Sequence, residues 1–188
     1  MKDIWNRMEA WLQANAKEVL LGLNPPATLE QIAAAEAELG ISFPPDVAET
    51  FLIHNGQDSN TPWLLDGWEF MSLERVVDEW KVWKDLLDGG DFDGEGISSE
   101  SDGHTVTDWW NPRWIPLTYD GASDHHCLDL APGPLGKSGQ IIQMWHDDDS
   151  RPLIAPSYRE WLNGLVNDFE AGRYELSAEY GGIVKRGS

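Results

Sequence analysis

The stretch from Trp109 to Leu130 constrains the fold more than any other part of this chain. Residues 114–119 are aromatic and β-branched enough to form a strand, and residues 127–130 alternate apolar with polar side chains, as half-buried strands do. Pro116 lacks a backbone N–H, so the first strand is expected to be kinked or short. An Asp-Gly pair at 120–121 supplies a turn, because glycine adopts positive φ freely. The stretch predicts two central strands joined by a polar loop.

The charge of the chain restricts what it can bind. Its 33 acidic side chains against 13 basic ones give a formal net charge of −20. Such a charge repels phosphate backbones and anionic lipid headgroups, so we expect no nucleic-acid partner. It favours a basic partner through electrostatic steering. The alternative is that the charge only keeps a tryptophan-rich protein in solution.

Length and cysteine content indicate the general class of protein. A chain of 188 residues, 41% of them apolar, is long enough to bury a core without disulfides or structural metals. Cys127 is the single cysteine and has no intramolecular partner. No apolar run reaches the length of a signal-peptide core or a membrane span. We therefore expect a cytoplasmic protein that does not insert into membranes.

Several segments have helical spacing with recognisable ends. A capping box at Thr28 and Gln31 opens one helix and Gly40 ends it, while Ser157 with Glu160 opens another that ends near Gly172. The remaining helices are expected at residues 3–21, from 45 to about 54, and 73–88.

The other segments predict strands and loops. An Asp-Gly pair within residues 63–70 indicates a hairpin of two short strands, and a further strand is expected at 141–145. Residues 89–108 have no periodicity and collect glycine, serine and acidic side chains, which is typical of an exposed loop. The order of elements does not alternate as βαβ units do. It predicts a single α+β domain, 1–188, with N-terminal helices, a central, mostly antiparallel sheet and a C-terminal helix.

Two patterns suggest metal sites, and each has a simpler explanation. Asp91, Asp93 and Glu100 resemble part of a calcium loop, but no helix follows them and Gly89 stands at the first ligand position. His125, His126 and Cys127 offer zinc ligands, with His104 or His146 as a further donor, but neighbours in a strand, such as His126 and Cys127, point to opposite faces. A solvated acidic loop and a buried cysteine are the favoured interpretations, and no metal or cofactor is predicted.

Catalytic motifs are absent from the sequence. It contains no nucleophile elbow, phosphate-binding glycine loop or paired-histidine metalloprotease motif. Asp129 is the one carboxylate expected within a core strand. We favour a structural role for it, as an acceptor of hydrogen bonds from a neighbouring loop, over that of a general base.

Four groups of residues occur in the order found in one known family. The chain resembles the SUKH superfamily, which contains bacterial toxin-immunity proteins and a fungal regulator of cell-wall assembly, at Ala37–Ile41 with Pro44–Pro45 and Phe51–Gly56, at Trp114–Leu117 with Asp120–Gly121, at Cys127–Leu130 with Gly139–Ile142, and at Ile154–Leu162. The similarity covers residues 28–172, with 1–27 as an N-terminal helix and 173–188 as a weakly patterned tail. The resemblance implies a non-enzymatic binding domain, and in bacteria most often an immunity protein that sequesters a toxin.

The residues left at strand ends and on loops suit a protein-binding surface. Tryptophan supplies buried area and carboxylates supply steering toward a basic partner. The candidate residues are Trp109, Trp110, Asp120, Asp124, His125, His126, Asp147 and Asp148. The first hypothesis is an immunity protein that binds and neutralises a cognate bacterial toxin, such as a basic nuclease. The alternative is a regulatory scaffold for cell-wall polymer (glucan) synthesis, whose fungal examples are expected to have long low-complexity flanks, and a hydrolase ranks last.

Overall fold

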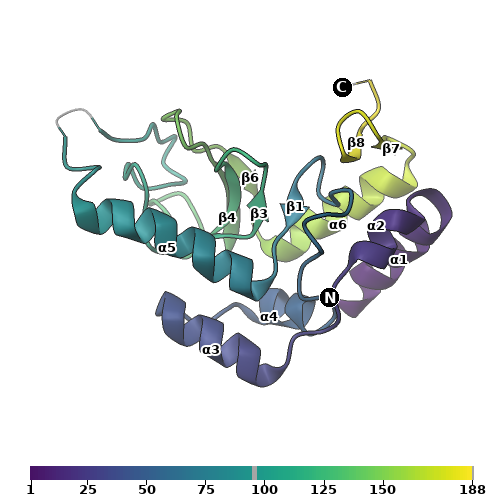
Figure 1. Ribbon diagram of the computed structural model, residues 1–188. Coiled ribbons are helices and arrows are strands. Elements are labelled where there is room, and N and C mark those ends of the chain that lie inside the picture. The colour runs from purple at the N-terminus through teal and green to yellow at the C-terminus, as the bar shows by residue number, and fades with distance from the viewer. Residues whose placement is uncertain (95–96, 188) are drawn as a thin grey trace.

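The computed structural model describes residues 1–94 and 97–187, and in them helices and short strands mix along the chain (Figure 1). The helices are α1 (Lys2–Asn15), α2 (Lys17–Gly22), α3 (Leu29–Leu39), α4 (Pro45–Phe51), α5 (Leu73–Gly89) and α6 (Tyr158–Glu170). The strands are β1 (Glu69–Phe70), β2 (Trp114–Pro116), β3 (Thr118–Tyr119), β4 (His125–Asp129), β5 (Gln140–Met144), β6 (Leu153–Ala155), β7 (Tyr174–Ser177) and β8 (Gly182–Lys185). The predicted α+β class is confirmed. Within the described ranges, every helix is too short or too polar to cross a membrane.

The first predicted helix is two helices in the structure. The break falls at Ala16, whose φ of −151° and ψ of 56° are not helical. The Asn15 side chain donates to the carbonyl oxygen of Trp11 at 2.9 Å and closes α1. The change of direction lets both Leu12 of α1 and Val19 of α2 reach the core, where neither is exposed.

The predicted helix starts are confirmed by side-chain caps. Thr28 Oγ1 accepts the backbone N–H of Gln31, and the Gln31 side chain accepts the N–H of Thr28 in return. Ser157 Oγ accepts the N–H of Glu160 at 3.2 Å. These caps satisfy N–H groups that the first turn of a helix leaves without partners.

The main sheet is antiparallel, with the order β2-β4-β5-β6. Ile115 of β2 lies opposite Leu128 of β4, and Leu128 lies opposite Ile141 of β5, with none of the three exposed. The two predicted strands are therefore present, but β2 lies at an edge of the sheet and only β4 is central. The first is short, as expected: β2 ends at Pro116, and β3 pairs with β1 in a separate two-stranded sheet.

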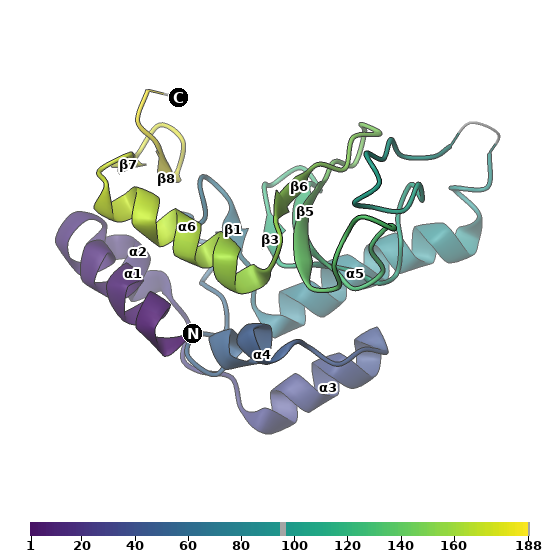
Figure 2. The same cartoon turned by 180° about the vertical axis from the view of Figure 1, so that it is seen from behind.

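Helices cover both faces of the main sheet. α5 contacts β2, whereas α6 contacts β5 and β6. Figure 1 shows α5 in front of the sheet, and Figure 2, seen from behind, brings α6 forward. α3 packs on α5 and α1 packs on α6. The two faces of the sheet therefore present their side chains to different helices.

The predicted turn at residues 66–67 is present, but its strands pair differently. Asp66 and Gly67 have φ of 56° and 80°, and Leu65 and Trp68 exchange both backbone hydrogen bonds across them. The prediction of two strands paired with each other is wrong. Trp63 instead forms an isolated bridge with Gly182, and β1 pairs with β3.

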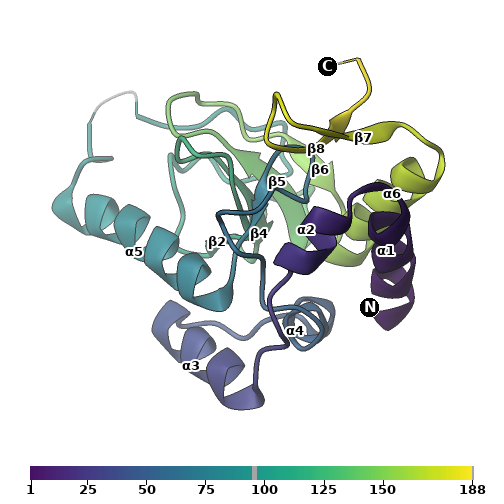
Figure 3. The same ribbon diagram turned by 45° about the vertical axis from the view of Figure 1, so that its right-hand side comes forward.

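The tail, which the sequence left unassigned, forms a hairpin. β7 and β8 pair antiparallel, with Tyr174 opposite Lys185. The ring of Tyr174 meets Phe169 of α6 edge-on at 5.1 Å between centroids. Figure 3 shows the hairpin near one end of α6. In this position the hairpin forms one wall of a pocket, through Tyr174 and Lys185.

Beyond Gly89, which ends α5, the described residues of the predicted loop (90–94 and 97–108) have no helix or strand but fold back onto the domain. Ser99 and Thr105 are buried. The Ser99 N–H donates to the carbonyl oxygen of Thr107 at 2.9 Å, and the Glu100 N–H donates to that of Asp149 at 2.8 Å. The second bond ties this loop to the loop that follows β5.

Candidate functional site

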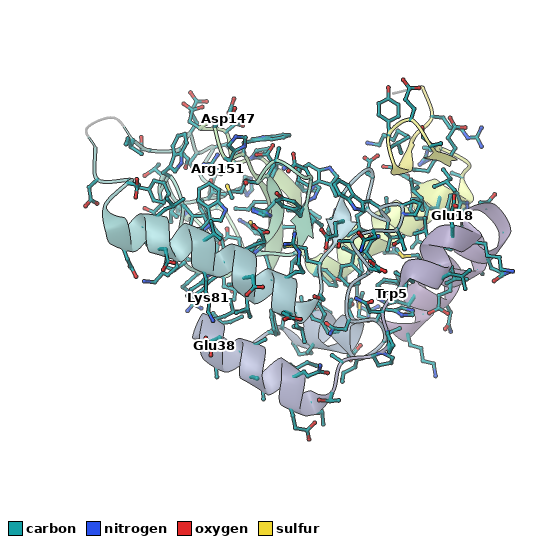
Figure 4. All side chains as sticks on the ribbon, in the orientation of Figure 1. Trp5, Glu18, Glu38, Lys81, Asp147 and Arg151 are labelled. Atoms are coloured by element: carbon teal, nitrogen blue, oxygen red, sulfur yellow. The ribbon has the colours of Figure 1, made fainter. Side chains whose placement is uncertain are left out.

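Two loops meet at one end of the main sheet. Residues 120–124 lead into β4, and residues 145–151 follow β5. Because His125 pairs with Met144, the start of β4 lies beside the end of β5. Figure 4 shows Asp147 and Arg151 at this end of the molecule. We define the acidic lip as the surface formed here by Asp120, Asp124, His146, Asp147 and Asp148.

A histidine and a buried carboxylate are paired at the centre of the lip. Asp124 is 7% exposed, and its Oδ1 accepts the backbone N–H of His146 at 2.7 Å and contacts His146 Nδ1 at 2.9 Å. Asp147 Oδ2 lies 3.9 Å from His146 Nε2. The hydrogen bond to Asp124 raises the pKa of His146 above its ordinary value. The pair therefore favours the protonated form of His146.

Asp120 and Asp148 each organise the loop that carries them. Asp120 Oδ1 accepts the backbone N–H groups of Ala122 and Asp124, at 2.7 and 3.0 Å. Asp148 Oδ1 accepts the N–H of Ser150 at 2.7 Å. One oxygen of each carboxylate is thus used in a turn.

Arg151 anchors the loop that follows β5, residues 145–151. Its guanidinium is buried and donates to the carbonyl oxygens of Asp148 and Ser150, at 2.6 and 2.7 Å, and to that of Trp109 at 2.8 Å. It also lies 5.2 Å from the centroid of the Trp109 ring, in a cation–π contact. Trp109 is therefore half-buried against Arg151 and joins the lip to the segment before β2.

Two predicted site residues lie in the core. Trp110 is 2% exposed, and its ring stacks on Trp83 at 6.3 Å. His125 is fully buried, and its Nε2 lies 3.3 Å from Trp83 Nε1. Both side chains face α5. Both therefore belong to the core beneath the lip and not to its surface.

His126 points to the opposite face of the sheet. Its ring centroid lies 4.5 Å from that of Trp68 and 5.2 Å from that of Trp161 on α6. Burial lowers the pKa of His126 to about 4. The histidine lines a pocket of about 390 Å³ between α6, β6 and the β7–β8 hairpin. The eight predicted residues are thus divided among the lip, the core and this pocket.

The structure brings together other possible metal ligands than the sequence patterns suggested. Within residues 1–94 and 97–187, the one cluster of possible ligands is Asp124, His146 and Asp147, whose ligand atoms lie within 4.8 Å of one another. Asp124 Oδ1 and His146 Nδ1 already contact each other, so a cation would have to break that contact. Cys127 is buried, which raises the pKa of its thiol. Its neighbour His126 faces α6, so the two do not share a ligand site.

Asp129 has the structural role that its position in a core strand indicated. It is fully buried, and its two carboxylate oxygens accept hydrogen bonds from the Ala131 N–H and the Gln140 side chain, each at 2.8 Å. Burial raises its pKa. Both oxygens are thus engaged within the fold.

Sequence reasoning missed Arg151, Trp68 and Trp161 as parts of these sites. Trp161 is half-buried on α6, and its helical spacing indicates the core and not a pocket. An arginine two residues after an acidic run, as Arg151 is after Asp149, signals an anchor for that run. The contact of Trp68 with His126 had no local signal, because it joins segments far apart in the sequence.

The fold and the lip define a class of protein. It is an α+β domain in which helices cover both faces of an antiparallel sheet and one end of the sheet presents carboxylates beside half-buried aromatic rings. The chain belongs to the SMI1 / KNR4 family (SUKH-1), whose model matches residues 26–164. The predicted membership of the SUKH superfamily is confirmed.

Named relatives extend over nearly the whole chain. The chain is 30% identical to the cell wall assembly regulator SMI1 of Saccharomyces cerevisiae, over 92% of this chain and 41% of that protein. It is 28% identical to the cell wall biosynthesis/cell cycle regulator smi1 of Schizosaccharomyces pombe, over 93% and 37%. It is 27% identical to the glucan synthesis regulatory protein of Neurospora crassa, over 90% and 38%. The chain spans about two fifths of the length of these relatives.

These relatives overturn the first functional hypothesis. The assignment as an immunity protein against a bacterial toxin is wrong, since the similar proteins are named as regulators of cell-wall and glucan synthesis. The reason lies in what the motifs encode. Residues 114–116 and 127–129 are buried strand residues, so they specify the fold that the superfamily shares and carry no information on the partner.

Proposed function

We propose that this chain is a non-enzymatic, protein-binding regulatory domain that acts in cell-wall polymer synthesis, glucan included. The observation that carries the proposal is the 30% identity to the Saccharomyces cerevisiae regulator over 92% of this chain. The names of the Schizosaccharomyces pombe and Neurospora crassa relatives support the same process. These relatives are named as regulators, which is compatible with a domain that acts by binding.

The lip supports a basic protein as the partner. Its carboxylates lie on two fixed loops, where Asp148 and Ser150 are tied to Trp109 through Arg151. A pre-organised acidic surface steers and orients a basic partner at little entropic cost. The net charge of −20 disfavours nucleic acid. We place the activity in the cytoplasm, in keeping with a single buried cysteine.

A domain replacement tests the proposal. In a Saccharomyces cerevisiae strain without its cell wall assembly regulator SMI1, this chain replaces the matching two fifths of that regulator. We expect the chimera to restore cell-wall glucan content toward that of the parent strain. The measurement is glucan per cell wall mass, with chimera abundance followed by immunoblot.

Two controls make the result specific. The regulator without the matching segment sets the baseline. A chimera carrying Trp114→Asp places a charge at an unexposed core position and removes the fold. If a chimera as abundant as the native regulator restores no more glucan than the baseline, the proposed function is wrong.

A further inference from the structure

The pocket beside α6 combines aromatic walls with an acidic rim. Its aromatic walls are His126, Trp161 and Tyr174, from β4, α6 and β7. Its carboxylates are Asp66, Glu160 and Asp168, against one lining cation, Lys185. Aromatic faces attract cations, and carboxylates neutralise them. The pocket therefore has the chemistry of a site for one cationic side chain.

A glycine in the middle of α6 opens the floor of this pocket. Gly164 lies between Glu160 and Asp168 on the helix. Glycine is the least favourable residue, apart from proline, inside a helix. Packing does not require it here, because a Cβ added to Gly164 would meet no atom within 4 Å. A side chain at this position would project into the space that a ligand would occupy.

The chain already holds cations of its own at the rim. Lys185 Nζ lies 3.8 Å from Asp66 Oδ2 and 6.0 Å from the centroid of the Tyr174 ring. Arg173 forms an ion pair with Asp168. These pairs engage two of the three rim carboxylates, so an incoming cation would meet Glu160 or exchange with one of the chain's own cations.

Other features fix the shape of the pocket. Asp66 has a positive φ of 56°, and its Oδ2 accepts the hydroxyl of Tyr174 at 3.0 Å. His126 Nδ1 lies 3.0 Å from Thr118 Oγ1, and the His126 ring contacts those of Trp68 and Trp161 at tilted angles. Ile154 is 42% exposed at the edge and offers apolar surface around the opening. The walls thus come from elements that pack on one another.

We propose that this pocket receives an arginine side chain of the partner protein, stacked against Trp161 and His126 with its guanidinium directed at the carboxylate rim. Arginine suits the site better than lysine because its flat guanidinium is weakly hydrated, stacks on aromatic rings and forks to carboxylates. The inference rests on the proposed function in taking a protein as the partner. It adds that the partner supplies an arginine and that the pocket beside α6 recognises this arginine.

The test uses three peptides that differ at one position. The probes are acetyl-GSGXGSG-amide, with X as arginine, lysine or citrulline, added to the ¹⁵N-labelled full chain. The signal is the indole N–H of Trp161, assigned with Trp161→Phe. We expect a saturable shift with the arginine peptide and at least tenfold weaker binding of the citrulline peptide, which has the same shape without the charge, with lysine between them.

Two variants at Gly164 separate binding from folding. Gly164→Phe fills the pocket and should abolish the shift caused by the arginine peptide. Gly164→Ala keeps most of the space and should retain binding, and both should show the circular dichroism spectrum of the parent. Equal binding of arginine and citrulline, equal binding of arginine and lysine, or a shift that persists in Gly164→Phe would each overturn the proposal.

The chimera assay distinguishes this inference from the proposed function. If the chimera restores glucan and its Gly164→Phe version does so equally, the pocket is not the partner site although the regulatory function stands. If the peptide binds as expected and the chimera restores nothing, the arginine pocket stands and the proposed function fails.

Discussion

Trp83 Nε1 lies 3.3 Å from His125 Nε2, and this contact determines the protonation state of a buried histidine. The indole N–H can only donate, so Nε2 must accept. The other ring nitrogen, Nδ1, lies 2.7 Å from the carbonyl oxygen of Thr118 and must donate. Both contacts are satisfied only by the neutral ring with its proton on Nδ1. Protonation would turn two donors toward each other, in a site without solvent.

Acid should therefore destabilise the fold through His125. Burial lowers its pKa to about 4, from 6.5. Between these values the unfolded chain binds a proton that the folded chain does not, so stability falls as pH falls from 6.5 toward 4. A shift of this size corresponds to about 3 kcal/mol in the free energy of unfolding at the acid end. Urea unfolding of the parent and of His125→Gln at pH 7, 6 and 5 measures it.

The comparison between the two proteins isolates this histidine from other groups. Asp129 has a raised pKa and acts in the opposite sense, and it is present in both proteins. We expect the difference in stability between parent and His125→Gln to shrink as pH falls. A difference that is the same at pH 7 and pH 5 would contradict a neutral, buried His125.

The pair of Asp124 and His146 predicts a titration with the opposite sign. The hydrogen bond to Asp124 raises the pKa of His146, so this pair stabilises the fold below the unfolded pKa of histidine and loses its contribution as pH rises through the folded pKa. In Asp124→Asn the pKa of His146 should return toward its ordinary value. NMR titration of the histidines measures the pKa of His146 in both proteins. An unchanged pKa in the variant would show that Asp124 does not stabilise the protonated imidazole.

Local chemistry explains which parts of the fold the sequence predicted. The caps at Thr28 and Ser157 act within three residues, so the helix starts could be found from the chain alone. The bridge between Trp63 and Gly182 joins segments far apart in the sequence, and the β7–β8 hairpin is placed by the contact of Tyr174 with Phe169 of α6. Nothing in a local window indicates such partners.

The site was predictable to the same extent. The acidic and aromatic residues of the site could be found from the sequence. Their grouping in space could not, because it depends on which residues of β4 and β5 pair. Asp124 meets His146 only because β4 and β5 pair with His125 opposite Met144. The alternation of faces that argued against a shared zinc ligand also separates His125, facing α5, from His126, facing α6.

A third prediction concerns Gly56, where backbone geometry and space both require glycine. Its φ is +71°, and an added Cβ would lie 2.3 Å from the backbone nitrogen of Ser72. Gly40 is the matched control, with φ of +66° and no atom within 4 Å of an added Cβ. We expect Gly40→Ala to cost about 1 kcal/mol and Gly56→Ala several times as much, on the order of 3 kcal/mol or more. Urea unfolding of both variants checks this, and equal losses would contradict the close approach.

The last prediction tests whether position or total charge governs partner binding. Asp147→Asn with Asp148→Asn removes two charges from the lip, and Glu18→Gln with Glu30→Gln removes two charges elsewhere. Figure 4 shows Asp147 and Glu18 at opposite ends of the molecule. Steering depends on charge near the contact, because salt screens charges farther away than about 8 Å. In the chimera assay, the lip variant should restore less glucan than the parent chimera, and the Glu18 and Glu30 variant should restore as much. Equal losses of glucan with both variants would mean that net charge alone governs partner binding. No loss with either variant would mean that the lip is not part of the partner surface.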